Sequence, residues 1–476
     1  MNHDVGVHTD AGGESAAGSG GSSEVLRLNP AAEVQNPPAG PGAGQADMPA
    51  RGIFAQRAHD QPNRRGRSVL VWRGCAVANA KEAAMNRRTS LRMLVFLFLI
   101  SSGWTAFAAT PERVVDMTAS DGVKLKGTFF AAGRPGPGVL LLHQCNKDRQ
   151  IWSGLARELA DSGINVMTLD LRNFGESEGT PNDNLTPQEA QAARAKWPSD
   201  IDKAYDYLVS QPGVKRDVIG VGGASCGVNN SVQTALRHPE VKSLVLLAGS
   251  ADIKGREFLR RSAKLPILFG YADDDEFPLT IKIIQWLYSI SPYPGNRIVS
   301  YDKGGHGAEI FAVHPEFKDV IRDWFVTTLI TTPGRARETK RVSIPQDVAI
   351  LDQIDKLGGA ERVSKMLKEA RARDPKAQLF SEDIVNGTGY EHLQAGDTKG
   401  AVAILKLNVE AYPGSANVYD SVSDAYLADG QRELARQSAR RALELLPTDP
   451  TQDDRRRKGI KASAESKLKQ LEEAPK

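Results

Sequence analysis

This sequence has no large excess of positive or negative charge. Its 476 residues have a net charge of +3 at pH 7, although 25% of them are charged. Proteins that bind nucleic acid through its phosphates carry clustered Lys and Arg and a clear positive excess, so we predict no nucleic-acid partner. The apolar residues make up 40% of the chain, which is enough for two globular domains.

Long apolar runs are missing as well. The run Met93–Ile100 is much shorter than the roughly 20 residues that a membrane-spanning helix needs. It follows the basic stretch Met85–Arg92 and precedes the small-residue site Ala106–Ala108. These are the three parts of a secretory signal peptide. We therefore expect cleavage after Ala108 and a mature protein without a stable membrane span, in the periplasm or outside the cell.

A sustained apolar period is absent from residues 1–84, which are dominated by Gly, Ala, Ser and Pro. Such a segment cannot bury enough surface to offset its chain entropy, so we expect it to be disordered. A signal peptide works at a chain's N-terminus, so residues 85–108 suggest that translation begins at Met85 and that residues 1–84 are an artefact of start-site assignment. The alternative is a cytoplasmic or membrane-anchored protein with a long disordered tail.

From Pro137 to about Thr331, short apolar segments alternate with helical ones. This alternation predicts an α/β fold with a mostly parallel sheet that helices cover on both faces. An antiparallel hairpin is expected before it, because Ser120–Gly122 separates two extended runs. The apolar segments are 138–142, 165–171, 217–222, 242–247, 265–269 and 297–301.

The motif Gly223-x-Ser225-x-Gly227 lies between a buried-strand run and a helical segment. Its small residues allow a turn so tight that the serine hydroxyl stands clear at the top of the sheet. The motif alone is weak evidence, but two further groups follow at strand ends, the acidic run Asp273–Glu276 and the glycine-flanked His306. A serine, an acid and a histidine in this order predict nucleophilic catalysis at the carboxyl ends of the strands.

These motifs make residues 122–331 resemble the α/β-hydrolases, in particular the dienelactone-hydrolase-related group. Pro137–Gln144 resembles the third strand with its oxyanion loop, and Asp170–Ser177 resembles the fourth strand with its turn. The resemblance implies an α/β-hydrolase fold in which Ser225 is the nucleophile and His306 is the base.

The acid is selected by the same resemblance. The family's acid segment ends in proline, and counting four positions back from Pro278 gives Asp274. Asp252, which follows the sixth strand, is the alternative, because some relatives carry the acid there. The predicted chemistry uses no cofactor and no metal.

The resemblance also implies an oxyanion hole, made by the backbone N–H of Cys226 and one from the region of Gln144 and Cys145. The loop reads His-Gln-Cys where many relatives have His-Gly, which leaves the second donor open. The nucleophile is serine where dienelactone hydrolase has cysteine, so that enzyme's substrate is not carried over.

Cysteine is scarce, and of three in the chain only Cys145 and Cys226 follow the predicted cleavage site. None directly follows the apolar core of the signal peptide, which argues against a lipid anchor. The fold implied by the resemblance brings the two onto opposite walls of one small cavity. Two alternatives remain for this pair: a disulfide, which an oxidising compartment would favour, or two small buried thiols.

A lid domain is absent from the pattern, because only residues 250–264 separate the sixth strand from the next. Residues 176–197 are the other segment that could cover the site, and they are short. We therefore expect an open or shallow pocket that takes a small or flexible acyl substrate.

Past Thr331 the strands stop. Residues 332–345 form a linker with a basic first part, and residues 346–476 show helical periodicity. Matching residues recur there at the 34-residue period of tetratricopeptide repeats, which this region resembles. Such repeats would offer a groove to a peptide, a protein or a second subunit, whereas the alternative is a brace packed on the hydrolase. The matching pairs are Leu393 and Leu427, Gly396 and Gly430, Ala401 and Ala435, and Pro413 and Pro447.

The sequence as a whole predicts an exported serine hydrolase that cleaves a small ester, lactone or related acyl substrate through an acyl-enzyme. A peptidase or acyl-amide hydrolase is the nearer alternative, although it would normally need a capping domain. The other alternative is a non-catalytic scaffold that acts through the helical repeats. Three chemical roles at the right strand ends favour the enzyme.

Overall fold

The structure is a computed structural model that describes residues 112–473. The predicted disordered segment 1–84 and the predicted signal peptide 85–108 lie outside these residues. Within the described part of the chain, no helix is long and apolar enough to cross a membrane.

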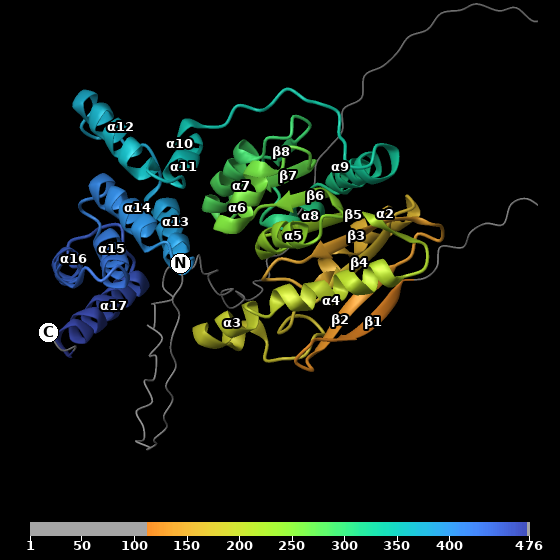
Figure 1. Ribbon diagram of the computed structural model, residues 1–476, viewed down its shortest axis with the longest axis horizontal. Helices are drawn as coiled ribbons and strands as arrows, with labels where there is room; N and C mark the ends of the chain where they lie inside the picture. The colour runs from red at the N-terminus through yellow and green to blue at the C-terminus, as the bar shows by residue number, and fades with distance from the viewer. Residues whose placement is uncertain (1–111, 474–476) are drawn as a thin grey trace, which may run out of the picture. The chain divides into compact units, whose positions relative to one another are not determined.

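Eight strands form one sheet in the first part of the described chain, and their order across the sheet is β1-β2-β4-β3-β5-β6-β7-β8 (Figure 1). The strands from β4 to β8 in this order pair in parallel, while β1 and β2 run antiparallel to their neighbours. The sheet is thus mostly parallel, as the sequence predicts. The strands are β1 (Arg113–Thr118), β2 (Lys124–Phe130), β3 (Gly136–Leu142), β4 (Asn165–Leu169), β5 (Val214–Ala224), β6 (Val241–Leu247), β7 (Ile267–Ala272) and β8 (Arg297–Tyr301).

Helices cover both faces of this sheet. Side chains in a strand alternate between the two sides, so the apolar strands present apolar side chains to both faces. On β3, Leu140 and Leu142 join the core beneath α4, α5, α6 and α7, whereas Val139 and Leu141 join the core beneath α2 and α9. All residues of β3 and β4 are buried, which is typical of parallel strands enclosed on both faces. The helices are α2 (Ser153–Asp161), α3 (Pro187–Arg194), α4 (Trp197–Ser210), α5 (Cys226–Arg237), α6 (Ile253–Arg261), α7 (Pro278–Ile290), α8 (Ile310–Val313) and α9 (Glu316–Phe325).

The carboxyl ends of the parallel strands lie along one edge of the sheet, and the predicted site residues follow these ends. Ser225 comes directly after β5, the acidic run follows β7, and His306 lies in the loop after β8. Between β6 and β7 the chain forms only α6, so no lid domain is inserted there. Residues 176–197 contain only the short 3-10 helix Asn182–Asn184, α3 and the first residue of α4.

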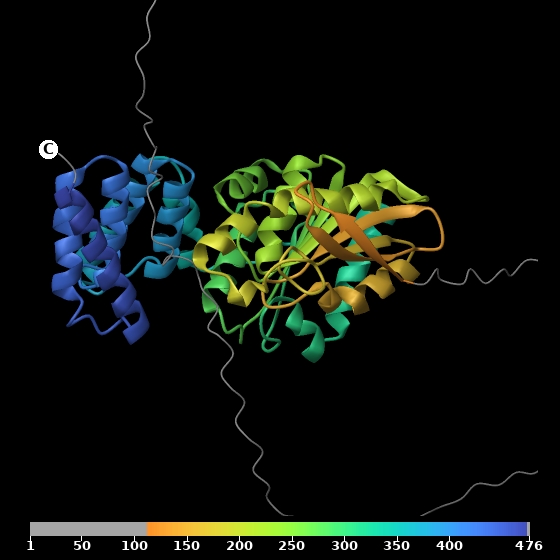
Figure 2. The same ribbon diagram turned by 90° about the horizontal axis from the view of Figure 1, so that it is seen from below.

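The C-terminal part is helical, as predicted, and residues 332–345 before it carry no helix or strand. The matching glycines share a left-handed backbone, with φ of 82° at Gly396 and 75° at Gly430. The matching Ala401 and Ala435 are both fully buried. Tetratricopeptide repeats remain a prediction. The helices are α10 (Gln346–Ala349), α11 (Leu351–Ile354), α12 (Gly359–Arg373), α13 (Glu382–Gln394), α14 (Thr398–Ala411), α15 (Ala416–Ala428), α16 (Arg432–Leu445) and α17 (Asp454–Glu473), several of them side by side in Figure 2.

A buried arginine joins α6 to these C-terminal helices. Arg256 donates to both carboxylate oxygens of Asp355, at 2.7 and 3.1 Å, and it also pairs with Glu391 of α13. Its third contact is a 2.7 Å hydrogen bond to the carbonyl of Ala251, in the loop after β6. The guanidinium stacks over the ring of Trp286, 4.8 Å from the ring centre. The C-terminal helices therefore hold an arginine that supports a loop at the carboxyl ends of the parallel strands.

Candidate functional site

Ser225 occupies a sharp turn between β5 and α5, with φ 53° and ψ −119°. A non-glycine residue with positive φ is uncommon and costs of order 1–3 kcal/mol, so the surrounding structure must hold it there. Its backbone N–H donates to the carbonyl of Leu247 at 2.9 Å, which ties the turn to β6. The residue is partly exposed.

Both glycines of the serine motif are required by close backbone approaches. A β-carbon on Gly223 would lie 2.1 Å from the carbonyl oxygen of Gly227, and one on Gly227 would lie 2.4 Å from the carbonyl oxygen of Leu142. No larger residue fits at either position, so this is the tight strand-to-helix turn expected from the sequence.

His306 is buried and contacts a buried carboxylate. Its Nδ1 lies 2.9 Å from Oδ2 and 3.0 Å from Oδ1 of Asp275, and the side chains are 2% and 0% exposed. The ring of Phe277 packs edge-on against the imidazole at 4.8 Å. A carboxylate at Nδ1 fixes the proton on that nitrogen and leaves Nε2 able to accept one.

The structure corrects the predicted partner of His306, which is Asp275 and not Asp274. The side chain of Asp274 is exposed and accepts the backbone N–H of Gly305 at 2.9 Å. The physical reason is the turn after β7, in which the N–H of Asp275 bonds back to the carbonyl of Ala272 at 3.3 Å. This turn directs the third aspartate of the run inward and the second outward.

The carboxylate of Asp275 is itself oriented by the start of α7. Its Oδ1 accepts the backbone N–H of Phe277 at 2.8 Å, and its Oδ2 accepts the hydroxyl of Thr280 at 2.9 Å. With His306, these contacts satisfy the buried charge, which would otherwise be costly. Nothing in three consecutive aspartates marks the inward one, although a threonine five residues downstream is consistent with it.

Asp252, the alternative acid, has a different role. It caps α6 by accepting the N–H of Gly255 at 2.8 Å, and its carboxylate also accepts from the side chains of Gln233 and Asn229. The carboxylate is thus committed to joining α5 to α6.

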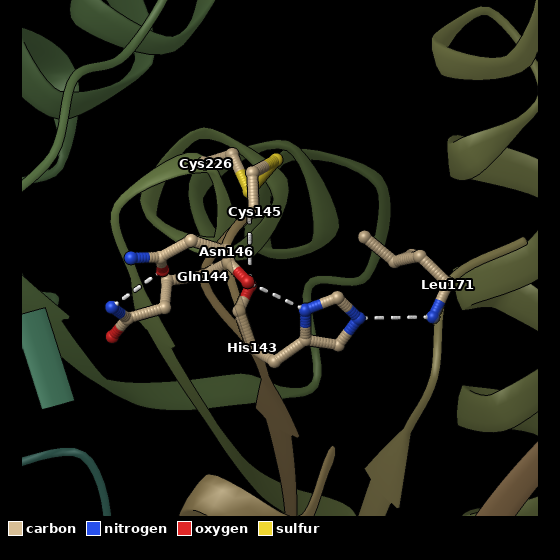
Figure 3. Close-up of a disulfide and its surroundings, with 6 residues drawn as sticks. All are labelled: His143, Gln144, Cys145, Asn146, Leu171 and Cys226. Atoms are coloured by element: carbon tan, nitrogen blue, oxygen red, sulfur yellow. Dashed lines mark hydrogen bonds between the residues drawn. A yellow bond between two sulfur atoms is a disulfide. The ribbon is translucent and has the colours of Figure 1, made fainter. Parts of the chain in front are cut away.

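The loop after β3 is held by a buried, neutral histidine. The Nε2 of His143 accepts the backbone N–H of Leu171 at 3.1 Å, so Nδ1 carries the proton and donates to the carbonyl of Gln144 at 2.8 Å (Figure 3). Burial lowers the pKa of His143 and favours this neutral form. Because a trans peptide points its C=O and N–H in opposite directions, the N–H of Cys145 is directed away from the His143 ring.

Cys145 and Cys226 form a disulfide, which settles the alternative left open by the sequence (Figure 3). Their Cα atoms are 5.8 Å apart, within the range that a disulfide requires. The bond joins the residue after Ser225 to the loop after β3. The two residues predicted to supply oxyanion donors are therefore covalently linked.

The side chain of Gln144 reaches the histidine loop. Its Nε2 donates to the carbonyl of His306 at 3.2 Å and its Oε1 accepts the N–H of Ala308 at 2.8 Å. A β-carbon on Gly307 would lie 3.2 Å from Cβ of Ala224, the residue before Ser225. The histidine loop thus passes next to the serine turn. The sequence gives no sign that the side chain of Gln144 contacts the histidine loop.

Residues 112–473 contain no cluster of side chains that could serve as a metal site. No group of three or more His, Cys, Asp or Glu side chains there is arranged to hold a metal ion.

Comparison with known families agrees with this architecture. Residues 137–279 match the family described as the alpha/beta hydrolase fold. Together with the mostly parallel sheet, the match confirms the predicted fold class.

Curated relatives align with part of the chain. A thiohydrolase, AneE, of Aspergillus aculeatus is 28% identical over 215 residues, which cover 43% of this chain and 63% of that protein. A polyketide transferase, GrgF, of a Penicillium species is 25% identical over 146 residues, which cover 30% of this chain and 47% of that protein. The chain thus spans less than two thirds of the length of these relatives.

Solved structures of similar fold include an esterase, Pf2001, of Pyrococcus furiosus, with 18% identity and a TM-score of 0.38 over 48% of this chain and 96% of that one. A dienelactone-hydrolase-like promiscuous phosphotriesterase, P91, from metagenomic libraries has 18% identity and a TM-score of 0.39, over 47% of this chain and all of that one.

Proposed function

We propose that the protein is a serine hydrolase that cleaves a small ester, lactone or thioester through an acyl-enzyme. The observation that carries the proposal is the buried carboxylate of Asp275 on Nδ1 of His306, in a loop that passes close to the strained strand-to-helix turn of Ser225 at Gly307 and Ala224. A nucleophile, a base and a group that orients the base are the three parts of this chemistry.

In this mechanism Ser225 attacks the carbonyl carbon while Nε2 of His306 takes the hydroxyl proton. Asp275 keeps the Nδ1 tautomer and stabilises the imidazolium that forms. His306 then gives the proton to the leaving alcohol or thiol, and the carbon–oxygen or carbon–sulfur bond breaks. A water molecule, activated by the same nitrogen, attacks the acyl-serine and releases the acid.

The negative charge on the carbonyl oxygen is assigned to the backbone N–H groups of Cys226 and Cys145. Cys226 is the first residue of α5, where unpaired N–H groups and the helix dipole favour an anion. The disulfide holds the second donor at a fixed separation from the first. Loss of one such donor typically raises the barrier by about 3 kcal/mol.

A thioester is the substrate class that the similarity to a thiohydrolase favours among acyl compounds. The absence of an inserted domain between β6 and β7 supports a small or flexible acyl group and disfavours the peptidase alternative. The helical part of the chain is proposed as a brace on the hydrolase part, because Arg256 and Asp355 form a buried pair between them.

Export is proposed on two grounds. The segment Met85–Ala108 has the parts of a signal peptide, and a disulfide is typical of an oxidising compartment. Expressed from Met85, the exported protein should begin at Ala109, which N-terminal sequencing tests.

Turnover of a matched set of substrates tests the enzyme proposal. The purified protein should hydrolyse 4-nitrophenyl esters and acyl thioesters of short chains, and Ser225→Ala should abolish turnover at an unchanged melting temperature. A folded wild-type protein inactive on every acyl chain length would favour the scaffold alternative.

A further inference from the structure

We propose that the side chain of Gln144 is a positioning group that holds the His306 loop against the oxyanion loop. This role rests on the proposed hydrolase function and adds a residue to it. The sequence predicts a role only for the backbone of Gln144, yet its side chain is fully buried and directed at the histidine loop.

The amide of Gln144 uses all of its hydrogen-bonding groups except one acceptor lone pair. Its two N–H groups donate to the carbonyl of His306 at 3.2 Å and to Oδ1 of Asn146 at 2.8 Å. Its oxygen accepts the N–H of Ala308 at 2.8 Å. The backbone partners fix which end is nitrogen, because a carbonyl requires a donor and an N–H requires an acceptor.

These contacts lie on either side of Gly307, the residue between His306 and Ala308. A β-carbon on Gly307 would lie 2.6 Å from Oε1 of Gln144, so a glycine there lets the amide approach the backbone. Gly307 also has a φ of 61°, which glycine adopts without strain. The amide therefore forms hydrogen bonds with the backbone on both sides of this glycine.

The two constraints on His306 are independent. Asp275 fixes the ring through Nδ1, and Gln144 fixes the backbone that carries the ring. Gln144 also precedes Cys145, the proposed oxyanion donor, so one residue sets the position of the base relative to that donor. An error of about 1 Å in such a position can cost about 100-fold in rate.

The same two loops share a second link that serves as a control. Lys147 pairs with Glu309 at 2.7 Å, but the side chains are 39% and 29% exposed. An exposed ion pair contributes little to structure. Lys147→Ala removes this ion pair. It tests whether kcat depends on any link between the two loops or on the buried amide of Gln144 in particular.

Three variants separate the contacts. Gln144→Met keeps the length of the side chain and removes all three hydrogen bonds, so we expect kcat to fall about 100-fold with KM nearly unchanged, while Lys147→Ala keeps wild-type kcat. Gln144→Glu, when protonated, can still donate to His306 and accept from Ala308. When ionised, it can only accept and repels the carbonyl.

The pH profile is the readout that a merely structural role would not produce. Burial raises the pKa of a carboxyl group, so the ratio of Gln144→Glu to wild-type kcat should fall as pH rises through the pKa of the introduced carboxyl group. The ratio for Gln144→Met should stay low at every pH. A flat ratio for Gln144→Glu, or wild-type kcat in Gln144→Met, would overturn the proposal.

Hydrogen exchange at Ala308 separates this proposal from the proposed function. The N–H of Ala308 should be protected in the wild type and in Lys147→Ala, and should exchange faster in Gln144→Met under conditions where that variant is still fully folded. If Ser225→Ala keeps wild-type turnover, the hydrolase proposal fails whatever Ala308 does. If Ser225→Ala is inactive and Gln144→Met leaves Ala308 equally protected, the positioning role alone fails.

Discussion

The Nδ1 of His306 lies 2.9 Å from the carboxylate of Asp275, and both side chains are almost completely buried. The adjacent Asp274 is exposed and accepts the backbone N–H of Gly305 in the histidine loop. One turn of the chain thus gives two neighbouring aspartates different roles. The buried one orients the imidazole of His306, and the exposed one holds the backbone of the loop that carries it.

Substitution by asparagine separates these two roles. Asp275→Asn should lower kcat by roughly 10⁴-fold, because an amide stabilises the wrong tautomer of His306 and cannot balance the imidazolium. Asp274→Asn keeps an oxygen that can accept from Gly305, so its kcat should remain within about tenfold of the wild type. Steady-state kinetics on one ester substrate compares them, and equal losses in the two variants would contradict the assignment.

Much of this arrangement can be predicted from the sequence, because each strand is a short apolar run and the serine motif carries its own turn. The sequence points to Asp274 rather than Asp275 as the partner of His306, since the count from Pro278 assumes a loop length that this chain does not share. The sequence leaves the Cys145–Cys226 bond open, because pairing depends on Cα separation and on side-chain direction. The contacts of Gln144 join residues 162 and 164 positions apart, and no local pattern encodes them.

The disulfide should matter for both stability and turnover. Its cysteines are 81 residues apart, and for a loop of that size the chain-entropy model gives a stabilisation of roughly 4–5 kcal/mol. The double variant Cys145→Ser, Cys226→Ser should therefore unfold at lower urea and, while still folded, turn over more slowly because both proposed oxyanion donors lie on the linked residues. Alkylation of the denatured, unreduced wild type should modify neither cysteine. Two alkylated thiols would rule the bond out.

The buried Asp355 should contribute more to stability than its partly exposed neighbour Asp352. Burial alone would raise the pKa of Asp355, but hydrogen bonds from His392, Arg256 and Arg260 lower it. Asp355→Asn leaves Arg256 buried with less compensation, so the free energy of unfolding should fall by about 3–5 kcal/mol.

The matched control is Asp352→Asn, since Asp352 pairs with Arg260 but is 23% exposed. Its free energy of unfolding should change by about 1 kcal/mol or less. Urea titrations give both values, and similar losses in the two variants would show that burial of the Arg256 pair does not dominate.

His392 should make stability depend on pH. Burial disfavours its charged form, but hydrogen bonds to Asp355 and Asp397, at 3.3 and 2.8 Å, outweigh burial and raise its pKa. A raised pKa means that the folded protein binds the proton more tightly, so the stabilisation is full below the unfolded pKa of about 6.5 and is lost as pH rises through the folded value.

The test compares the wild type with His392→Gln by urea unfolding at several pH values. The difference in unfolding free energy should be largest below about pH 6 and should shrink as pH rises through the raised pKa of His392. Arg256 also lies near this cluster and keeps its charge throughout, so it does not contribute to the slope. A difference that grows with pH would contradict the predicted sign.

The central claim is that Ser225 is an activated nucleophile, and labelling with a fluorophosphonate probe tests it most directly. The probe reacts with serine hydroxyls that an adjacent base activates, whatever the natural substrate. Peptide mapping of the purified protein should locate one label per chain, on Ser225, with slow labelling in Asp275→Asn and none in Ser225→Ala. A folded wild-type protein that takes up no label, or a Ser225→Ala variant that is labelled as fast as the wild type, would contradict the account.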